Sequence, residues 1–196
     1  DQTRILRTIK AKVFLELADW LNAHDVDGTV KMNCQGRWIS SDRKHYPYGY
    51  PERIRNSLRQ SLTRDEVTIL PDAEIVNLGI ILHPDQRDAI KQALRLKLGS
   101  QLNIVSSDRD NLDVIRPDCS KAAALALLAE RYKVPLSEVI VIGDSENDVG
   151  MFNIVKMSYC MADAEPQIQQ KAVQTVRSVA AALELEMAKL QAEQGS

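Results

Sequence analysis

The sequence predicts an α/β protein with two domains, an α+β domain over residues 1–114 and a parallel α/β domain over residues 115–196. In the second domain, helices alternate with strands that are apolar throughout, which is typical of a parallel sheet covered on both faces. In the first domain, a hairpin pattern and short strands alternate with helices, which favours a mostly antiparallel sheet. With 196 residues and 44% apolar content, the chain is long and apolar enough to bury a core.

The first domain begins with an amphipathic helix. Apolar residues recur every three or four positions from Ile5 to Leu21, so a helix is expected from about residue 5 to His24. Apolar residues at alternate positions from Val30 to Cys34, followed by the turn CQGR, then predict a β-hairpin.

Proline, glycine and apolar runs predict the rest of the first domain. The expected elements are a Tyr- and Pro-rich loop over 42–51, a short basic helix over 51–62, a strand near 75–82, a helix from Pro84 to Leu98 capped by Gly99, and strands within 102–107 and 112–117. These signals complete an α+β arrangement.

The second domain has longer apolar runs. The expected elements are an Ala- and Leu-rich helix over 120–132, a strand over 138–143, a helix start over 147–154, a strand over 157–162, and closing helices from about 164 and 178. Because only two strands are visible, its sheet is expected to be incomplete.

Composition argues against several classes of protein. The net charge of -2 and the absence of a basic run argue against a nucleic-acid partner. The apolar runs are far shorter than the roughly 20 residues of a membrane span, and the first residues show no signal-peptide pattern. Cys34, Cys119 and Cys160 are far apart without C-x-x-C spacing, so neither a disulfide framework nor a zinc site is expected, and a cytoplasmic location is favoured.

The strongest chemical signal is VIVIGDSENDVGMF, residues 139–152. In open parallel sheets, ligands bind beyond the carboxyl ends of the strands, where Asp144 would lie. Carboxylate and amide oxygens are the ligands that Mg²⁺ prefers. We therefore expect Asp144 to bind the metal directly, with Asn147 and Asp148 completing the shell or orienting its waters. The alternative is an acidic turn that caps the next helix at Asn147.

Lys121 is the second candidate, because PDCSKAAAL places it at the start of a helix. Cations are favoured at the opposite end of a helix, so a functional role would explain its position. An ammonium group there could neutralise a phosphate and a nucleophilic carboxylate during phosphoryl transfer. The alternative is a solvated surface lysine beside a cap formed by Ser120 or Asp118.

Together these segments resemble the haloacid dehalogenase superfamily, in particular its Cof-type sugar and small-molecule phosphatases. SKAAAL is similar to the family's third motif and carries Lys121, while GDSEND is similar to the fourth, in which acidic residues serve Mg²⁺. MADA is similar to the family's M-x-N-A segment, with Asp163 in place of the usual Asn. The resemblance covers roughly residues 111–184 and implies part of a Rossmann-like parallel core, with residues 1–114 as an α+β cap.

The resemblance also implies a D-x-D-G-T motif that supplies the nucleophile, followed by a Ser or Thr motif, both before the cap. The segment Asp25–Thr29 has the letters DVDGT. However, the residues before Asp25 keep a helical period and those after it alternate as in a hairpin, whereas a nucleophile loop follows a buried strand. We therefore expect Asp25–Thr29 to be a helix end, turn and strand start within the cap.

The family's first two motifs are then expected upstream of residue 1, so at least roughly 60 residues would be absent. The remaining half of the core should expose one sheet edge and part of its apolar faces. The runner-up is a smaller cap, with Asp25 as nucleophile and Ser106 as the second motif. Only fourteen residues then separate Ser106 from Lys121, too few for the helix that this arrangement needs.

Other polar residues carry weaker hypotheses. His24, His45 and His83 show no metal-ligand spacing and are expected in loops or on the surface. Arg43, Lys44 and His45 could meet an anionic substrate, although an ordinary solvated turn is the favoured interpretation.

The sequence therefore predicts a Mg²⁺-dependent phosphatase that acts on sugar phosphates or other small phosphomonoesters. Lys121 would hold the phosphate and the nucleophile together, and Asp144, Asn147 and Asp148 would serve the metal. The alternative function is a truncated or degenerate domain that binds a metal or a partner without turnover.

Overall fold

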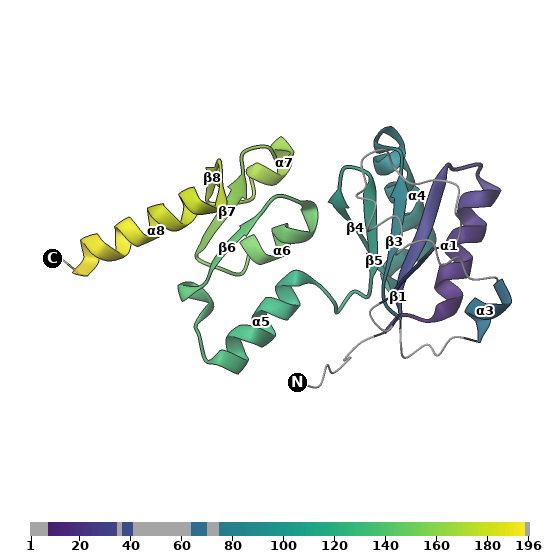
Figure 1. Cartoon of the computed structure of the whole chain (residues 1–196), viewed down its shortest axis with the longest axis horizontal. Coiled ribbons are helices and arrows are strands. Elements are labelled where there is room, and N and C mark those ends of the chain that lie inside the picture. The colour runs from purple at the N-terminus through teal and green to yellow at the C-terminus, as the bar shows by residue number, and fades with distance from the viewer. Residues whose placement is uncertain (1–7, 35–36, 41–63, 70–74, 195–196) are drawn as a thin grey trace. The chain divides into compact units, whose positions relative to one another are not determined.

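The computed structural model describes residues 8–34, 37–40, 64–69 and 75–194 (Figure 1). The chain divides into two compact units, unit 1 over Asp1–Cys119 and unit 2 over Ser120–Ser196. No helix in the described ranges is both long enough and apolar enough to cross a membrane.

Unit 1 is built around one antiparallel sheet. Its elements are α1 (Ala11–Ala23), β1 (Gly28–Cys34), β2 (Arg37–Ser40), α3 (Arg64–Thr68), β3 (Ile75–Leu82), η2 (Pro84–Gln86), α4 (Arg87–Leu98), η3 (Gly99–Gln101), β4 (Asn103–Asp108) and β5 (Asn111–Ile115). The strand order is β2-β1-β3-β5-β4, and every neighbouring pair is antiparallel. The predicted hairpin and the predicted antiparallel sheet are both confirmed.

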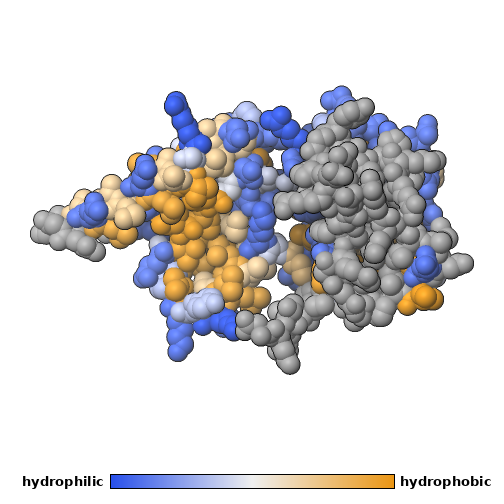
Figure 2. All heavy atoms as spheres, viewed as in Figure 1, coloured by the Kyte–Doolittle hydropathy of each residue, from blue (hydrophilic) through white to orange (hydrophobic). Residues whose placement is uncertain are grey.

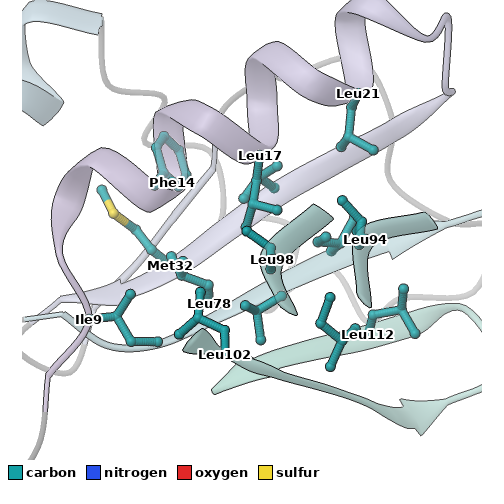
Figure 3. Packing of buried hydrophobic residues seen from close by; sticks show 14 of the residues in the cluster. Ile9, Phe14, Leu17, Leu21, Met32, Leu78, Leu94, Leu98, Leu102 and Leu112 are labelled. Atoms are coloured by element: carbon teal, nitrogen blue, oxygen red, sulfur yellow. The ribbon is translucent and has the colours of Figure 1, made fainter. Parts of the chain in front are cut away.

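The core of unit 1 lies between the sheet and the helices α1 and α4 (Figure 3). Because strand side chains alternate between the two faces, Val30 and Met32 of β1 and Leu78 and Ile80 of β3 all belong to this core. Each is fully buried, which stabilises the fold by roughly 1.5–3 kcal/mol per large apolar side chain.

The first helix starts later than its apolar spacing predicts. The structure places Ile9 and Lys10 outside the helix, with Lys10 in an extended conformation. The amide of Ile9 donates to the carbonyl of Ile75 at 2.8 Å, so this residue is buried by pairing with β3 rather than by a helical turn. The start predicted near residue 5 is therefore wrong, and α1 begins at Ala11.

The helix predicted from Pro84 to Leu98 is confirmed, with its first turn as a 3-10 helix. Gly99 ends it with φ at 56°, a left-handed conformation that glycine adopts without strain. The loop predicted over 42–51 and the helix predicted over 51–62 lie outside the described residues.

Unit 2 contains a parallel sheet with the order β6-β7-β8. Its elements are α5 (Lys121–Tyr132), η4 (Leu136–Glu138), β6 (Ile140–Gly143), η5 (Glu146–Asp148), α6 (Val149–Phe152), β7 (Met157–Met161), α7 (Pro166–Gln169), β8 (Gln174–Val176) and α8 (Val179–Gln194). The parallel sheet is confirmed, but the prediction of only two strands was wrong. The third strand, β8, has three residues of which only Val176 is buried, so it lacks the apolar run that marked the others.

Strand β6 has apolar contacts on both faces. Val141 belongs to a buried cluster with Phe152, Cys160 and Ile168. Ile142 packs instead against a second cluster, which Tyr159, Val176 and Ala182 form. Such two-sided burial is the pattern of a parallel strand in an α/β core.

Candidate active site

Two segments of unit 2 meet at the carboxyl end of β6. The Nζ atom of Lys121, the first residue of α5, lies 2.9 Å from Oδ1 of Asn147 and 2.5 Å from Oδ1 of Asp148. Both partners belong to η5, in the turn that follows β6. Three of the four residues singled out in the sequence are therefore in direct contact.

Lys121 lies where the helix itself disfavours a cation. Ser120 caps α5 by accepting a hydrogen bond from the amide of Ala123 at 3.0 Å, so Lys121 lies in the first turn, beside the positive end of the helix dipole. The Asp148 side chain supplies the compensation, because it is only 4% exposed and carries the opposite charge. A buried carboxylate needs such a partner, and this pair ties the start of α5 to the turn after β6.

Asp148 holds the turn after β6 in place, in addition to pairing with Lys121. Its Oδ2 atom accepts the backbone amides of Asp144 at 3.0 Å and Ser145 at 3.1 Å, while Oδ1 accepts from Lys121. Ser145 and Asp148 form a reciprocal capping box at the start of η5. The cap that the alternative interpretation placed at Asn147 is thus formed by Ser145.

Gly143 makes this arrangement possible. A Cβ atom at this position would lie 2.5 Å from Cβ and 2.6 Å from Cγ of Asp148. No side chain fits in that space, so the glycine before Asp144 is required by the close approach of Asp148.

Asp144 differs from Asp148 in its surroundings. Its side chain is exposed at the end of β6, and its Oδ1 atom accepts a hydrogen bond from the Ser145 hydroxyl at 3.0 Å. Its Oδ2 atom has no hydrogen-bond partner within the described part of the chain. Asp144 is therefore a carboxylate with coordination capacity, oriented by its neighbour.

The three residues predicted to serve Mg²⁺ fit that ion only in part. Both oxygens of Asp148 and the Oδ1 atom of Asn147 already accept hydrogen bonds, which leaves the carboxylate of Asp144. In the ranges that the structure describes, no three His, Cys, Asp or Glu side chains converge closely enough to hold a metal ion. Because Mg²⁺ takes six oxygen ligands, including several waters, Asp144 could hold it only together with further donors.

Cys160 lies beside the site, opposite Gly143 in the parallel register of β6 and β7. Burial raises the pKa of its thiol, and the charges of Asp144 and Asp148 raise it further. The thiolate is therefore disfavoured, which excludes Cys160 as an activated nucleophile. Asp163 is exposed in the turn after β7.

The DVDGT segment lies in unit 1, between a helix and an antiparallel strand. Asp25 follows the end of α1 with φ at 51°, and the amide of Val26 donates to the carbonyl of Leu21 at 2.9 Å. The prediction of a helix end, turn and strand start is confirmed. Close packing explains why residue Gly28 is a glycine, because a Cβ atom there would lie 2.5 Å from Cδ2 of Leu82.

The remaining candidates have local partners in unit 1. Ser106 is buried on β4 and accepts a hydrogen bond from Nζ of Lys91 at 3.0 Å. His24 stacks on Trp20 with ring centroids 4.3 Å apart, and His83 accepts from the amide of Asp85; both histidines are exposed, as expected. Arg43, Lys44 and His45 lie outside the described residues.

Comparison with known proteins places these residues in a family. A family model described as haloacid dehalogenase-like hydrolase matches residues 1–181. An HMP-PP phosphatase of Cronobacter sakazakii is 29% identical over 99 residues, which are 50% of this chain and 36% of that protein. A phosphoglycolate phosphatase of Archaeoglobus fulgidus is 34% identical over 83 residues, 42% of this chain and 37% of the relative.

A solved structure has the same fold. It is a haloacid dehalogenase-like hydrolase from Bacteroides thetaiotaomicron, with a TM-score of 0.65 and 20% sequence identity. The match covers 90% of this chain and 67% of that one. These two curated relatives are thus matched over little more than a third of their own length, and a third of the solved structure has no counterpart here.

Proposed function

Because the chain belongs to the haloacid dehalogenase-like hydrolases, we propose that it forms part of a Mg²⁺-dependent phosphatase that hydrolyses small phosphomonoesters. The observation that carries this proposal is the convergence of Lys121, Asn147 and Asp148 beside Asp144. A cation and an available carboxylate thus lie together at the carboxyl end of a parallel strand, where α/β proteins bind ligands.

Each residue of the site has a separate role in this proposal. The ammonium group of Lys121 contacts a phosphate oxygen and the attacking carboxylate, and offsets the charge that gathers as they approach. Asp148 and Asn147 hold that ammonium group in place, and Asp148 also shapes the turn that presents Asp144. Asp144 supplies one oxygen ligand to Mg²⁺, which when bound withdraws charge from the phosphoryl group.

The nucleophile comes from outside the present sequence in this proposal. Asp25 follows a helix in unit 1, so it does not emerge from the parallel sheet of unit 2, which ends at Asp144. An aspartate from a segment upstream of residue 1 would attack phosphorus and release the alcohol of the substrate. Water would then hydrolyse the aspartyl phosphate and release inorganic phosphate.

The names of two relatives support the substrate class that we propose. Two of them are named as phosphatases of HMP-PP and of phosphoglycolate, both small phosphorylated molecules. Sugar phosphates and similar small phosphomonoesters are the substrates that we propose here, with unit 1 as a cap that selects among them. The partner is then the substrate itself.

The incomplete donor set favours a second candidate, a domain that binds a metal or a partner without turnover. In the described residues, Asp144 is the predicted ligand with an exposed carboxylate, whereas Asp148 is buried and bonded through both oxygens. This candidate predicts no phosphatase activity in any longer form of the protein, whereas the phosphatase proposal predicts activity in the form extended upstream.

The experiment compares rates of aryl phosphate hydrolysis, with and without Mg²⁺, in a form extended upstream in the parent reading frame. We expect Mg²⁺-dependent turnover that falls by roughly 100- to 1,000-fold in Lys121→Met, the scale seen when one electrostatic stabiliser is removed. Asp144→Asn should raise the Mg²⁺ concentration required for half-maximal activity. Lys171→Met, which removes an exposed lysine of the same unit, is the matched control and should retain activity.

Absence of turnover in a folded extended form would favour the non-catalytic candidate. Equal activity of Lys121→Met and Lys171→Met would remove Lys121 from the mechanism.

A further inference from the structure

The turn after β6 is polar, although much of the surface of unit 2 is apolar. Figure 2 shows a broad apolar area on the visible face of this unit, and 11 of the 14 large apolar side chains exposed within the described ranges belong to it. The turn instead consists of five consecutive polar residues, 144–148. Hydrogen bonds among these residues, rather than apolar contacts, are therefore what arrange the turn.

Ser145 joins the two aspartates of this turn. Its side chain accepts a hydrogen bond from the backbone amide of Asp148, as one half of the capping box. Its hydroxyl donates to Oδ1 of Asp144 at 3.0 Å. Because a serine hydroxyl has one proton and an ionised carboxylate can only accept, these two bonds fix the direction in which the hydroxyl points. Ser145 therefore connects the backbone of Asp148 to the side chain of Asp144.

The position of Ser145 is itself fixed by Asp148. The backbone amides of Asp144 and Ser145 both donate to Oδ2 of Asp148, at 3.0 and 3.1 Å. That carboxylate is buried and paired with Lys121. The exposed side chain of Asp144 is thus held at the end of a series of contacts that begins at a buried ion pair.

The hydrogen bond from Ser145 makes the two oxygens of Asp144 unequal. Oδ1 shares its charge with the hydroxyl proton, whereas Oδ2 receives no hydrogen bond within the described part of the chain. The orientation of such a carboxylate matters for Mg²⁺, which demands near-ideal octahedral geometry. Ca²⁺ accepts one or both oxygens of a carboxylate in a flexible geometry. A loss of orientation at Asp144 would therefore affect Mg²⁺ more than Ca²⁺.

We propose that Ser145 is a positioning residue that sets the affinity and the selectivity of the site for Mg²⁺, by orienting the carboxylate of Asp144. Hydrogen bonds to metal ligands typically change metal affinity by about 10- to 100-fold. The inference rests on the proposed function for the assignment of Asp144 as a metal ligand. A serine that only capped η5 would affect the stability of the turn, and would not distinguish the two ions.

Calorimetric titration of the form extended upstream with Mg²⁺, and separately with Ca²⁺, tests the proposal without a measurement of turnover. The variant is Ser145→Gly, because glycine at an N-cap costs little stability but has no hydroxyl. We expect the dissociation constant for Mg²⁺ to rise by at least about 10-fold, and that for Ca²⁺ by less than about 3-fold. Ser145→Thr keeps the hydroxyl and should bind Mg²⁺ within about 3-fold of the unaltered protein.

Ser178→Gly is the matched control. Ser178 also caps a helix of unit 2, because its hydroxyl accepts a hydrogen bond from the amide of Ala181 at 3.1 Å at the start of α8. Its substitution removes an N-cap hydroxyl elsewhere in the unit, so both dissociation constants should be unchanged. Without added metal, the melting temperatures of Ser145→Gly and Ser178→Gly should agree within about 2 °C.

The same substitution has a separate signature in the phosphatase assay. Ser145→Gly should raise the Mg²⁺ concentration required for half-maximal activity, while the rate at saturating Mg²⁺ stays within about 3-fold of the unaltered protein. A lower saturated rate with an unchanged Mg²⁺ requirement would place Ser145 in the chemical step and would overturn the proposal.

Three results of the titrations would also overturn it: an unchanged Mg²⁺ affinity in Ser145→Gly, an equal loss of affinity for both ions, or failure of Ser145→Thr to restore Mg²⁺ binding. Binding and turnover fail separately. A selective loss of Mg²⁺ affinity in a protein without turnover would refute the phosphatase and support the role of Ser145. Absence of Mg²⁺ binding in the unaltered extended form would refute both.

Discussion

Unit 1 and unit 2 differ in how completely they bury their apolar side chains. The described part of unit 1 contains one continuous cluster of 18 buried residues, contributed by α1, α3, α4, the sheet and the segments just before α1 and β4. The described part of unit 2 contains two clusters, of four and three buried residues, on opposite sides of its sheet. The described part of unit 1 therefore has the core of an independent domain, whereas the described part of unit 2 buries fewer of its apolar side chains.

The same contrast extends to the chemistry. Unit 1 uses its polar candidates for its own structure, since Ser106 bonds to Lys91 and Gly28 makes room for Leu82. Unit 2 places a lysine at the start of a helix, bonded to the turn after β6, and an exposed carboxylate at the end of that strand. The unit with the smaller core thus holds the residues that we propose to be functional.

Core truncation should produce the largest difference between the units. Leu17 in α1 is fully buried, so Leu17→Ala should destabilise unit 1 by about 3–5 kcal/mol through lost burial and a cavity. Leu127 in α5 is 57% exposed, so Leu127→Ala should change stability by less than about 0.5 kcal/mol.

Urea denaturation followed by tryptophan fluorescence measures the first effect cleanly, because both tryptophans, Trp20 and Trp38, belong to unit 1. Far-UV circular dichroism measures the second. A large loss of stability in Leu127→Ala would show that the exposed surface of unit 2 is already covered in the present chain.

Removal of the Asp148 carboxylate should have an intermediate effect, confined to unit 2. Asp148→Ala removes the charged acceptor of the Lys121 ammonium group and the acceptor of two backbone amides, at a cost of roughly 1–3 kcal/mol. Asp144→Ala removes an exposed carboxylate and should be close to neutral. Thermal unfolding without Mg²⁺ compares the two, and equal destabilisation would refute the distinction between an organising and a ligand aspartate.

A change of pH should produce the smallest effect, at α8. Hydrogen bonds from Lys189 and Tyr159 lower the pKa of the Glu186 carboxyl. A lowered carboxyl pKa adds stability above the unfolded value, and this stability is lost as pH falls through the folded value. The contact with Glu186 raises the pKa of Lys189, so its contribution is lost only when pH rises through that higher value.

We therefore expect α8 amides to remain protected at neutral pH and to exchange faster, relative to β7 amides, once the pH falls below about 4. Hydrogen exchange at several pH values measures this effect. Glu186→Gln should remove the acidic dependence, and an unchanged dependence in this variant would place its origin elsewhere.

The sequence was most informative where chemistry fixes residue types. GDSEND and the lysine of SKAAAL identified the segments that meet at the end of β6, because few other patterns place these groups around a parallel strand. The helical period before Asp25 likewise predicted that DVDGT follows a helix. Such local patterns can be predicted from the sequence because residues close together in the chain determine them.

The sequence was less informative where contacts between residues far apart in the chain determine the structure. Strand β8 has no apolar run, so only its pairing with β7 defines it. Ile9 keeps the helical spacing of α1 but pairs with β3. The contacts of Asp148 are also tertiary, because its lysine partner lies 27 residues away. From the sequence alone, an aspartate at this position is equally compatible with a metal ligand.

We propose that the catalytic centre belongs to unit 2, with a nucleophile from upstream rather than Asp25. Mg²⁺-dependent hydrolysis of an aryl phosphate tests it in four proteins: the present chain, the upstream-extended form, and Asp25→Asn in each. We expect turnover in both extended proteins at the same rate, and none in the present chain. Turnover by the present chain that disappears in Asp25→Asn would contradict the account.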